Sequence, residues 1–403
     1  MPKKRDDVHS WMAHIDNLAT GVGPRGSTTK VELLASKYCQ MVLSDLGLKP
    51  KMESFQSARS IYQPHLLAAA MMLLSFAIYP LMGRVSAGAA AVLALLALGS
   101  DLLELSFRGN LLRWILPKGD SQNVVAVAPA GGRARQDIVL MGHVDSHRTP
   151  IIFSSERWVA TYKAFTTVAF VAFALQFILY LLGAITQWLW IWPVSLVSVV
   201  AAVLLIALCL QADSTPFSAG ANDNATGAGL VLTLAERLRR QPLRHTRVWL
   251  VCTGCEEVQH YGAIDFYRRH RHKLLAPKAI AFEMLGCAGP SWLTKEGIVI
   301  PFLADRQMVR WAEELAAAHP EWRAHPTAIT GGNTEMADAL RVGIPAITLT
   351  GMTPKGDAPY WHQVGDTADK MDREILARAL AFVWAYLERL DQQATPARPA
   401  KRS

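Results

Sequence analysis

Charged residues and cysteines are both scarce in this chain. Only 18% of its 403 residues are charged, against roughly 25% in an ordinary soluble domain, and 51% are apolar. Such a chain is neither disordered nor fibrous, because those classes are poor in apolar residues or strictly repetitive. The five cysteines are scattered and odd in number, so we expect no disulfide framework and a reducing compartment. The charged N-terminus has no apolar run behind it, and we expect no cleavable signal peptide.

Long apolar runs hold the surplus of apolar residues. They cover residues 66–82, 85–99, 164–185 and 188–210. A helix needs about 20 apolar residues to cross a bilayer, and the last two runs reach that length without a charge. The first two runs are shorter, so a buried helical hairpin in a soluble core stays open for them. Turns at 83–84 and 186–187 join the runs into two hairpins, and we predict four transmembrane helices.

Two membrane hairpins return the chain to the side from which it started, so the remaining residues can form one domain. We predict hairpins at 64–106 and 158–212, one domain built from 1–63, 107–157 and 213–393, and a basic tail at 394–403. The net charge of +8 is as typical of proteins at anionic lipid as of nucleic-acid binders. With the membrane hairpins we expect a lipid bilayer as partner and no nucleic acid. Basic residues flank the runs, whereas the hairpin tips carry only Arg84. The positive-inside tendency therefore predicts a multi-pass cell membrane protein with its large domain on the cytoplasmic side.

Short β-branched runs alternate with amphipathic helical segments outside the hairpins. Strands are expected at 123–128, 137–141, 247–252, 279–282 and 346–349, and helices at 29–47, 226–240, 260–271, 306–318 and 371–391. Continuous apolar strands between helices predict an α/β fold with a doubly wound, mostly parallel sheet flanked by helices. Ligands of such folds bind at the carboxyl ends of the strands.

Acids and histidines follow several of these expected strands. His143 and Asp145 come where one strand ends, and Glu256 and Glu257 where another ends. The other candidates are Asp223 in a small-residue loop, Glu283 at a strand end and His362 before the last helix. Each motif alone is weak, because such residues are more often structural or solvated. Together, so many acids in one crevice would repel one another, and a divalent metal held by imidazole and carboxylate would offset that charge.

The order H-x-D, D-N-x-[ST]-G, E-E, D/E and H resembles the M28 family of two-zinc metallopeptidases. Segments 23–27 (GPRGS), 343–349 (GIPAITL) and 362–372 (HQVGDTADKMD) are similar to further parts of that family. The resemblance implies a zinc-exopeptidase-like fold and two Zn²⁺ ions, although other divalent metals suit the same ligands. Glu283 departs from the pattern, since many relatives have Asp there, and the two hairpins are insertions.

The resemblance also implies a role for each candidate residue. The implied metal ligands are His143, Asp223, Glu257, Glu283 and His362. Asp223 would bridge the two ions and precede a cis peptide bond to Asn224. Glu256 would be the general base, and Asp145 would orient His143.

These roles imply a membrane-embedded two-zinc exopeptidase that hydrolyses short peptides, most simply an aminopeptidase. A glutaminyl-cyclase-like acyltransferase with a single zinc and a non-catalytic membrane pseudo-peptidase are the alternatives. Because the second hairpin lies between His143 and Asp223, we expect the crevice close to the bilayer surface and hydrophobic or membrane-derived peptides as substrates. The sequence leaves the oligomeric state and the preferred side chain open.

Overall fold

The computed structural model describes residues 6–394, which form two compact units. The sheet unit comprises the described residues up to Arg59, Lys118–His147 and those from Phe217 onward, and the helical unit comprises Ser60–Pro117 and Arg148–Pro216. The helical unit is therefore wider at every boundary than the expected hairpins 64–106 and 158–212. The expected basic tail lies outside the described residues except for Ala394.

One mixed sheet runs through the described part of the sheet unit, in the order β1-β2-β4-β3-β5-β9-β6-β7, with β8 beside β6. The strands are β1 (Lys51–Ala58), β2 (Lys118–Ala128), β3 (Gln136–His143), β4 (Thr246–Thr253), β5 (Lys278–Glu283), β6 (Ser291–Glu296), β7 (Phe302–Leu303), β8 (His325–Ala328) and β9 (Ala346–Thr350). All five expected strands are present. The central strands β4, β3, β5 and β9 are parallel.

The expectation of a mostly parallel sheet is wrong at both margins. β1 pairs antiparallel with β2 and β2 with β4, and β6 is antiparallel to both β9 and β7. The missed marginal strands lack the continuous apolar run that predicted the inner ones. β1, for example, reads KMESFQSA and is largely exposed over its first half. An edge strand of this kind leaves little hydrophobic pattern to detect.

Helices cover both faces of this sheet. They are α1 (Asp7–Asp16), α2 (Lys30–Asp45), α8 (Thr226–Arg240), α9 (Tyr261–His270), α10 (Arg306–Ala318), α11 (Met336–Arg341) and α12 (Arg373–Gln392). The predicted bounds of α8 and α10 are confirmed to the residue. Aspartates define two of the starts, because Asp305 and Asp372 accept hydrogen bonds from the first free backbone N–H groups of α10 and α12.

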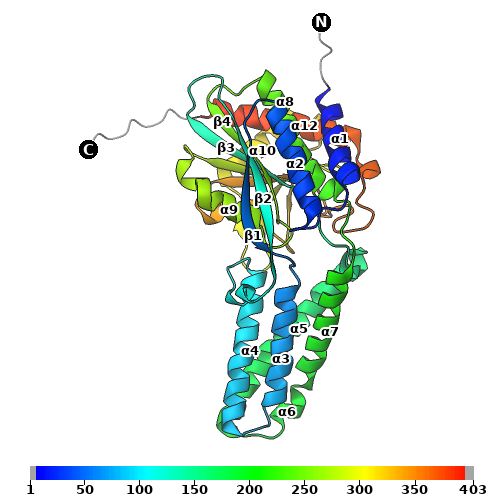
Figure 1. The fold of residues 1–403 in the computed structure, drawn as a ribbon, viewed down its shortest axis with the longest axis vertical. Helices are drawn as coiled ribbons and strands as arrows, with labels where there is room; N and C mark the ends of the chain where they lie inside the picture. The colour runs from blue at the N-terminus through cyan, green and yellow to red at the C-terminus, as the bar shows by residue number, and fades with distance from the viewer. Residues whose placement is uncertain (1–5, 395–403) are drawn as a thin grey trace, which may run out of the picture. The chain divides into compact units, whose positions relative to one another are not determined.

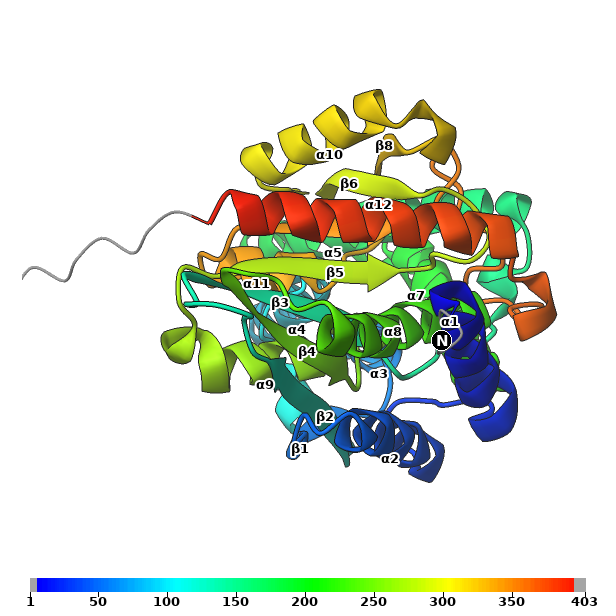
Figure 2. The same ribbon diagram turned by 90° about the horizontal axis from the view of Figure 1, so that it is seen from above.

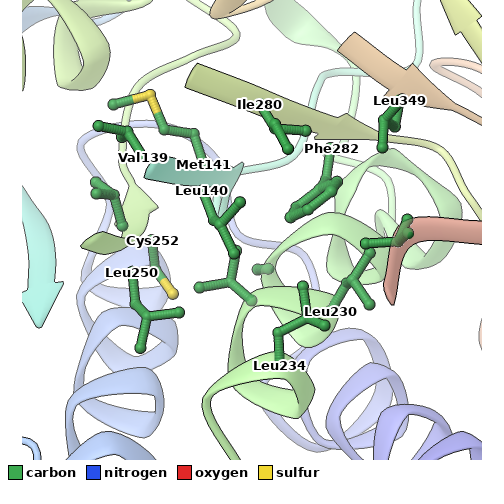
Figure 3. Packing of buried hydrophobic residues seen from close by; sticks show 14 of the residues in the cluster. Val139, Leu140, Met141, Leu230, Leu234, Leu250, Cys252, Ile280, Phe282 and Leu349 are labelled. Atoms are coloured by element: carbon green, nitrogen blue, oxygen red, sulfur yellow. The ribbon is translucent and has the colours of Figure 1, made fainter. Parts of the chain in front are cut away.

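Strand β3 lies at the centre of the core, and all eight of its residues are buried. Leu140 points toward α8, whereas Val139 and Met141 point to the opposite face (Figure 3). On that second face, the hydroxyl of Tyr267 in α9 donates to the sulfur of Met141 at 3.5 Å. In the view of Figure 2, β5 lies between α12 and α8. A strand covered by helices on both sides carries apolar residues at every position.

The helical unit contains α3 (Gln63–Ile78), α4 (Arg84–Leu105), α5 (Glu156–Thr186), α6 (Ile191–Val194) and α7 (Leu196–Ser214), with α3, α4, α5 and α7 side by side (Figure 1). Three of its helical segments are long and apolar enough to cross a membrane: Arg84–Leu105, Glu156–Thr186 and Ile191–Ser214. The helix of the first apolar run, α3, has 16 residues and is shorter than the roughly 20 that a bilayer requires.

Small and polar side chains lie between these helices, together with larger apolar ones such as Met72 and Phe173. Buried alanines at positions 87, 90, 91, 94 and 97 line one side of α4. Gln176 of α5 donates to the hydroxyl of Ser75 in α3 at 2.8 Å, and Ser198 of α7 donates to the backbone oxygen of Ala172 at 2.9 Å. The outer faces are apolar instead, with Val168 and Val197 each more than 60% exposed. Small and polar residues at the helix contacts are typical of helices packed in lipid.

Candidate active site

The carboxyl ends of three neighbouring parallel strands supply most of the candidate residues. β3 ends at His143, β5 ends at Glu283, and Glu256 and Glu257 follow the end of β4. β3 pairs with β4 on one side and with β5 on the other, so these ends meet at one edge of the sheet. The sequence prediction that these side chains share an edge is therefore fulfilled by the sheet order itself.

Asp223 lies between the two histidines. Its Oδ1 is 3.3 Å from His143 Nε2, and its Oδ2 is 3.3 Å from His362 Nε2. Glu283 Oε2 lies 3.5 Å from His143 Nε2, and Glu257 Oε2 lies 3.2 Å from His362 Nε2. The five residues expected to hold metal thus form two groups of three that share Asp223, one oxygen to each group.

The spacing of the atoms around His143 fits a metal ion, because one ligand atom each of His143, Asp223 and Glu283 lie within 4.8 Å of one another. The same holds for His147, Glu257 and His362 on the other side. Ligand atoms bonded to one zinc at roughly 2.0–2.2 Å lie about 3.3–3.5 Å apart in a tetrahedron. Glu257 Oε1 and Glu283 Oε1 are buried and accept no hydrogen bond from any residue between 6 and 394. Buried carboxylate oxygens without a donor are costly unless a cation neutralises them. Imidazole nitrogen and carboxylate oxygen form a donor set that suits zinc.

The pKa values of the carboxyl groups in this cluster also favour a bound cation. Burial raises the pKa of Glu257 to about 8 and that of Glu283 to about 7. Burial also raises the pKa of Asp223, but hydrogen bonds with His143 and His362 outweigh this, so its pKa lies well below the ordinary value. A bound divalent ion would keep all three carboxylates ionised, which burial alone opposes.

The Asp223–Asn224 peptide bond is cis, as the resemblance implied. The segment Ala221–Ala225 enters α8, and the Asn224 side chain fastens it to β5 by donating to the backbone oxygen of Phe282 at 2.7 Å. Asp366 accepts from the backbone N–H groups of Asn222 and Asp223, at 2.6 and 3.0 Å. These bonds hold the backbone of the loop that carries Asp223.

Asp145 touches both His143 and the Glu256–Glu257 segment. Its backbone oxygen lies 3.0 Å from His143 Nδ1, whereas its carboxylate Oδ1 lies 3.5 Å from that nitrogen. The carboxylate accepts from the backbone N–H groups of Glu256 and Glu257, at 3.1 and 3.2 Å, and from the Ser27 hydroxyl at 2.7 Å. Asp145 therefore positions the two glutamates as well as the imidazole.

Arg25 is a site residue that the sequence analysis did not single out. Its side chain is fully buried and donates to five backbone oxygens. Val144 and Gly220 are among these acceptors, so Arg25 connects the end of β3 to the loop that carries Asp223. Burial lowers its pKa to about 10. In the sequence, Arg25 was indicated only by the similarity of residues 23–27 (GPRGS) to the M28 family. That similarity gives no role for the arginine.

Two further histidines lie in the cluster and were also missed. The His147 ring stacks on His362 with 3.7 Å between centroids, and one ligand atom of each, with one of Glu257, lie within 4.8 Å of one another. His260 Nε2 lies 3.1 Å from Glu256 Oε1. The available signal for His147 was its position four residues after His143, and for His260 its position four residues after Glu256.

Comparison with known proteins agrees with this architecture. Residues 207–387 match the sequence profile of peptidase family M28. Aminopeptidase YwaD of Bacillus subtilis (strain 168) is 25% identical over 175 residues, which are 43% of this chain and 38% of that protein. The chain thus spans less than two fifths of the length of this curated relative.

Two solved structures share the fold at low sequence identity. A Bacteroides thetaiotaomicron glutaminyl cyclase bound to N-acetylhistamine is 13% identical with a TM-score of 0.56, and the match covers 94% of this chain and 97% of that one. BSAP, a zinc aminopeptidase from Bacillus subtilis, is 12% identical with a TM-score of 0.56, and the match covers 95% of each chain. At these identities the likeness shows an α/β fold with a mixed sheet and flanking helices.

Residues 207–387 therefore resemble a peptidase family M28 domain. The profile match and the aminopeptidase relative support the expectation that the chain is a zinc-dependent hydrolase. The matched segment includes Asp223, Glu256, Glu257, Glu283 and His362. His143 and Asp145 lie before it, and their place in the site rests on the distances given above.

Proposed function

We propose that this protein is a membrane-embedded, two-zinc exopeptidase that acts as an aminopeptidase on short peptides. The observation that carries the proposal is the pair of three-residue groups that share Asp223, with one histidine and one glutamate in each. His143 and Glu283 would hold one ion, and His362 and Glu257 the other. A zinc pair at these ligands would supply Lewis acidity toward a peptide carbonyl and toward a water molecule.

Glu256 is the residue placed to move the proton. Its Oε2 faces the ligand cluster, 3.8 Å from His143 Nε2, while its Oε1 contacts His260. Glu256 takes a proton from the attacking water as the new O–C bond forms. It then gives this proton to the leaving amine as the C–N bond breaks, so that the carboxylate is regenerated.

A glutaminyl-cyclase-like acyltransferase activity is the second candidate function, and the structural likeness to glutaminyl cyclases favours it. Two sets of ligand atoms, one around His143 and one around His362, favour a pair of ions over one. Zinc stoichiometry separates the two functions: about two ions per chain agrees with the peptidase, and one with the cyclase. A non-catalytic pseudo-peptidase would turn over none of the substrates.

The decisive experiment compares the wild type with Glu256→Gln, which keeps the shape of the side chain but cannot accept the proton. We expect both proteins to bind about two zinc ions by elemental analysis. Turnover of fluorogenic aminoacyl substrates should fall by roughly 10²–10⁴-fold in the variant, the usual contribution of a general base. The exposed Glu313→Gln serves as matched control and should keep wild-type turnover. A Glu256→Gln protein that retains full activity would contradict the assignment of the base.

We further propose that the apolar helices lie in a bilayer with the sheet unit on the cytoplasmic side. The three long apolar segments and their exposed valines and leucines support the placement in a bilayer. The basic residues that flank the apolar runs support the cytoplasmic side. The chain enters the helical unit five residues after His143, which favours hydrophobic or membrane-derived peptides as substrates. Equal cleavage of soluble peptides with and without lipid would remove the support for that substrate class.

A further inference from the structure

We infer that His260 and Asp338 are positioning residues that hold the Glu256 carboxylate in its working orientation. The inference rests on the proposed role of Glu256 and adds two residues to which the M28 resemblance gives no part. The three side chains form a buried row, from the base to the histidine to the aspartate. His260 is 2% exposed and Asp338 is 3% exposed.

His260 is tied to Glu256 twice. Its backbone N–H donates to the backbone oxygen of Glu256 at 2.8 Å, which closes a tight turn. Its ring nitrogen Nε2 lies 3.1 Å from Glu256 Oε1. The residue adopts a left-handed backbone conformation, with φ of 56°, and stands directly before α9. A non-glycine residue in this conformation is uncommon and is held by its surroundings.

Asp338 fixes the other side of the imidazole. Its Oδ2 lies 2.7 Å from His260 Nδ1, and its Oδ1 accepts from Arg341 at 3.1 Å. It belongs to α11, which packs against β9 and β5. A charge-assisted bond of this length holds the plane of the ring, and with it the direction of Nε2.

The row leaves one oxygen of the base available. Glu256 Oε1 is engaged by His260, so Oε2 is the oxygen that faces His143 and the ligand cluster. A glutamate side chain has several rotamers, and fixing one of them before substrate arrives removes an entropic cost from the proton transfer. His260 therefore acts on the reaction through Glu256 and need not touch substrate.

The alternative is that His260 only fills the core between α9 and α11. The two roles differ in what a substitution does to the rate. His260→Gln places an amide N–H near the position of Nε2 and can still donate to Glu256, whereas His260→Leu fills the space without a donor. A purely structural role predicts that both variants lose stability, with no selective loss of kcat.

The test measures kcat, KM and zinc content for the wild type, His260→Leu, His260→Gln and Asp338→Asn. We expect kcat to fall by roughly 10–100-fold in His260→Leu, with KM within about threefold of the wild type and zinc content unchanged. His260→Gln should recover most of the loss, and Asp338→Asn should lie between. His272→Gln, at an exposed histidine, is the control. An unchanged kcat in His260→Leu, or no recovery in His260→Gln, would overturn the inference.

A binding measurement keeps the inference separate from the proposed function. A wild type that hydrolyses none of the aminoacyl substrates would refute the aminopeptidase proposal. An amino-acid hydroxamate binds metal through two oxygens and offers an O–H or N–H to a neighbouring carboxylate, so its affinity reports the position of Glu256. The zinc-loaded His260→Leu protein should bind leucine hydroxamate about tenfold more weakly than the wild type, with His260→Gln close to the wild type. Equal affinities would show that His260 does not position Glu256.

Discussion

Buried carboxylates are the unusual feature of this protein at the scale of single residues. Besides the proposed metal ligands, burial raises the pKa values of Glu32, Glu296 and Glu335 to about 8 in each case. Glu296 accepts from the Thr334 hydroxyl at 2.7 Å. Burial favours the protonated form of such a group, so each of these side chains ties folding stability to pH.

Glu296→Gln should change how stability depends on pH. The folded protein keeps the Glu296 proton up to about pH 8, whereas the unfolded chain releases it near the ordinary value of 4.5. The free energy of unfolding of the wild type therefore falls as the pH rises between these values, and glutamine removes that part of the fall. The difference in Tm, variant minus wild type, should be higher at pH 8 than at pH 5 by roughly 3 °C or more. Thermal unfolding in chelator measures it without a contribution from metal.

The exposed Glu313→Gln provides the comparison for this measurement. Its Tm difference from the wild type should be the same at both pH values. A Glu296→Gln difference that is equally flat would mean that Glu296 is ionised in the folded protein.

Close contact between β3, α8 and β5 is the decisive feature at the scale of elements. A Cβ atom on Gly142 of β3 would lie 2.5 Å from the backbone carbon of Gly227 in α8. One on Gly227 would lie 2.4 Å from the backbone oxygen of Phe282 in β5. Both glycines are next to site residues, since Gly142 precedes His143 and Gly227 follows the Asp223 loop. The absence of side chains lets three elements approach closely enough to bring the proposed metal ligands together.

Gly227→Ala should therefore damage both the fold and the metal site. The overlap is with backbone atoms that cannot rotate away, so we expect a loss of about 1–3 kcal/mol in the free energy of unfolding. The displaced Asp223 loop should also weaken zinc binding by tenfold or more, measured by competition with a chelator. Gly21→Ala is the matched control, because its added methyl would meet atoms only at 3.8 Å or beyond. Equal zinc affinity in the two variants would show that the loop tolerates the displacement.

At the scale of the whole molecule, the chain leaves the sheet unit twice to form the helical unit. Each of the two inserted segments begins and ends at residues of the sheet unit that lie next to each other in space. Ala58 pairs with Lys118 across the β1–β2 ladder, and the N–H of Ser218 donates to the backbone oxygen of His147 at 2.9 Å. The sheet unit therefore closes on itself at both insertion points, and its own core does not require a long connection there.

A shortened chain tests this description. An Asn-Gly turn would replace residues 59–117, since Ala58 and Lys118 form the last pair of the antiparallel β1–β2 ladder, and a short Gly-Ser link would replace 148–216. We expect the shortened protein to be soluble without detergent and to bind about two zinc ions. The full chain should stay in the membrane fraction after an alkaline carbonate wash.

Either of two results would contradict the description of the helical unit as a separate membrane anchor. A shortened protein that still needs detergent would place the apolar anchoring in the sheet unit. A full chain released by the wash would mean that the apolar helices do not span the bilayer. All four apolar runs would then form buried helical hairpins in a soluble protein, the alternative that the sequence left open for the first two.

Local pattern alone determined the elements and the candidate residues. Apolar runs predicted the inner strands and the long apolar helices, and helical spacing predicted α8 and α10, because these signals depend only on near neighbours in sequence. The polar edge strand β1 carries no such signal and was missed. The placement of acids and histidines at strand ends was also readable, since parallel strands present those ends at one edge.

Only the tertiary structure decided which residues support the site. Arg25 reaches five backbone oxygens from separate segments, and His260 meets Asp338 across 78 positions of sequence. Such contacts depend on the path of the whole chain between the partners, and no local periodicity encodes that path. The sequence thus determined which groups could do chemistry, whereas the packing of distant segments decided which oxygen of Glu256 faces His143 and which faces His260.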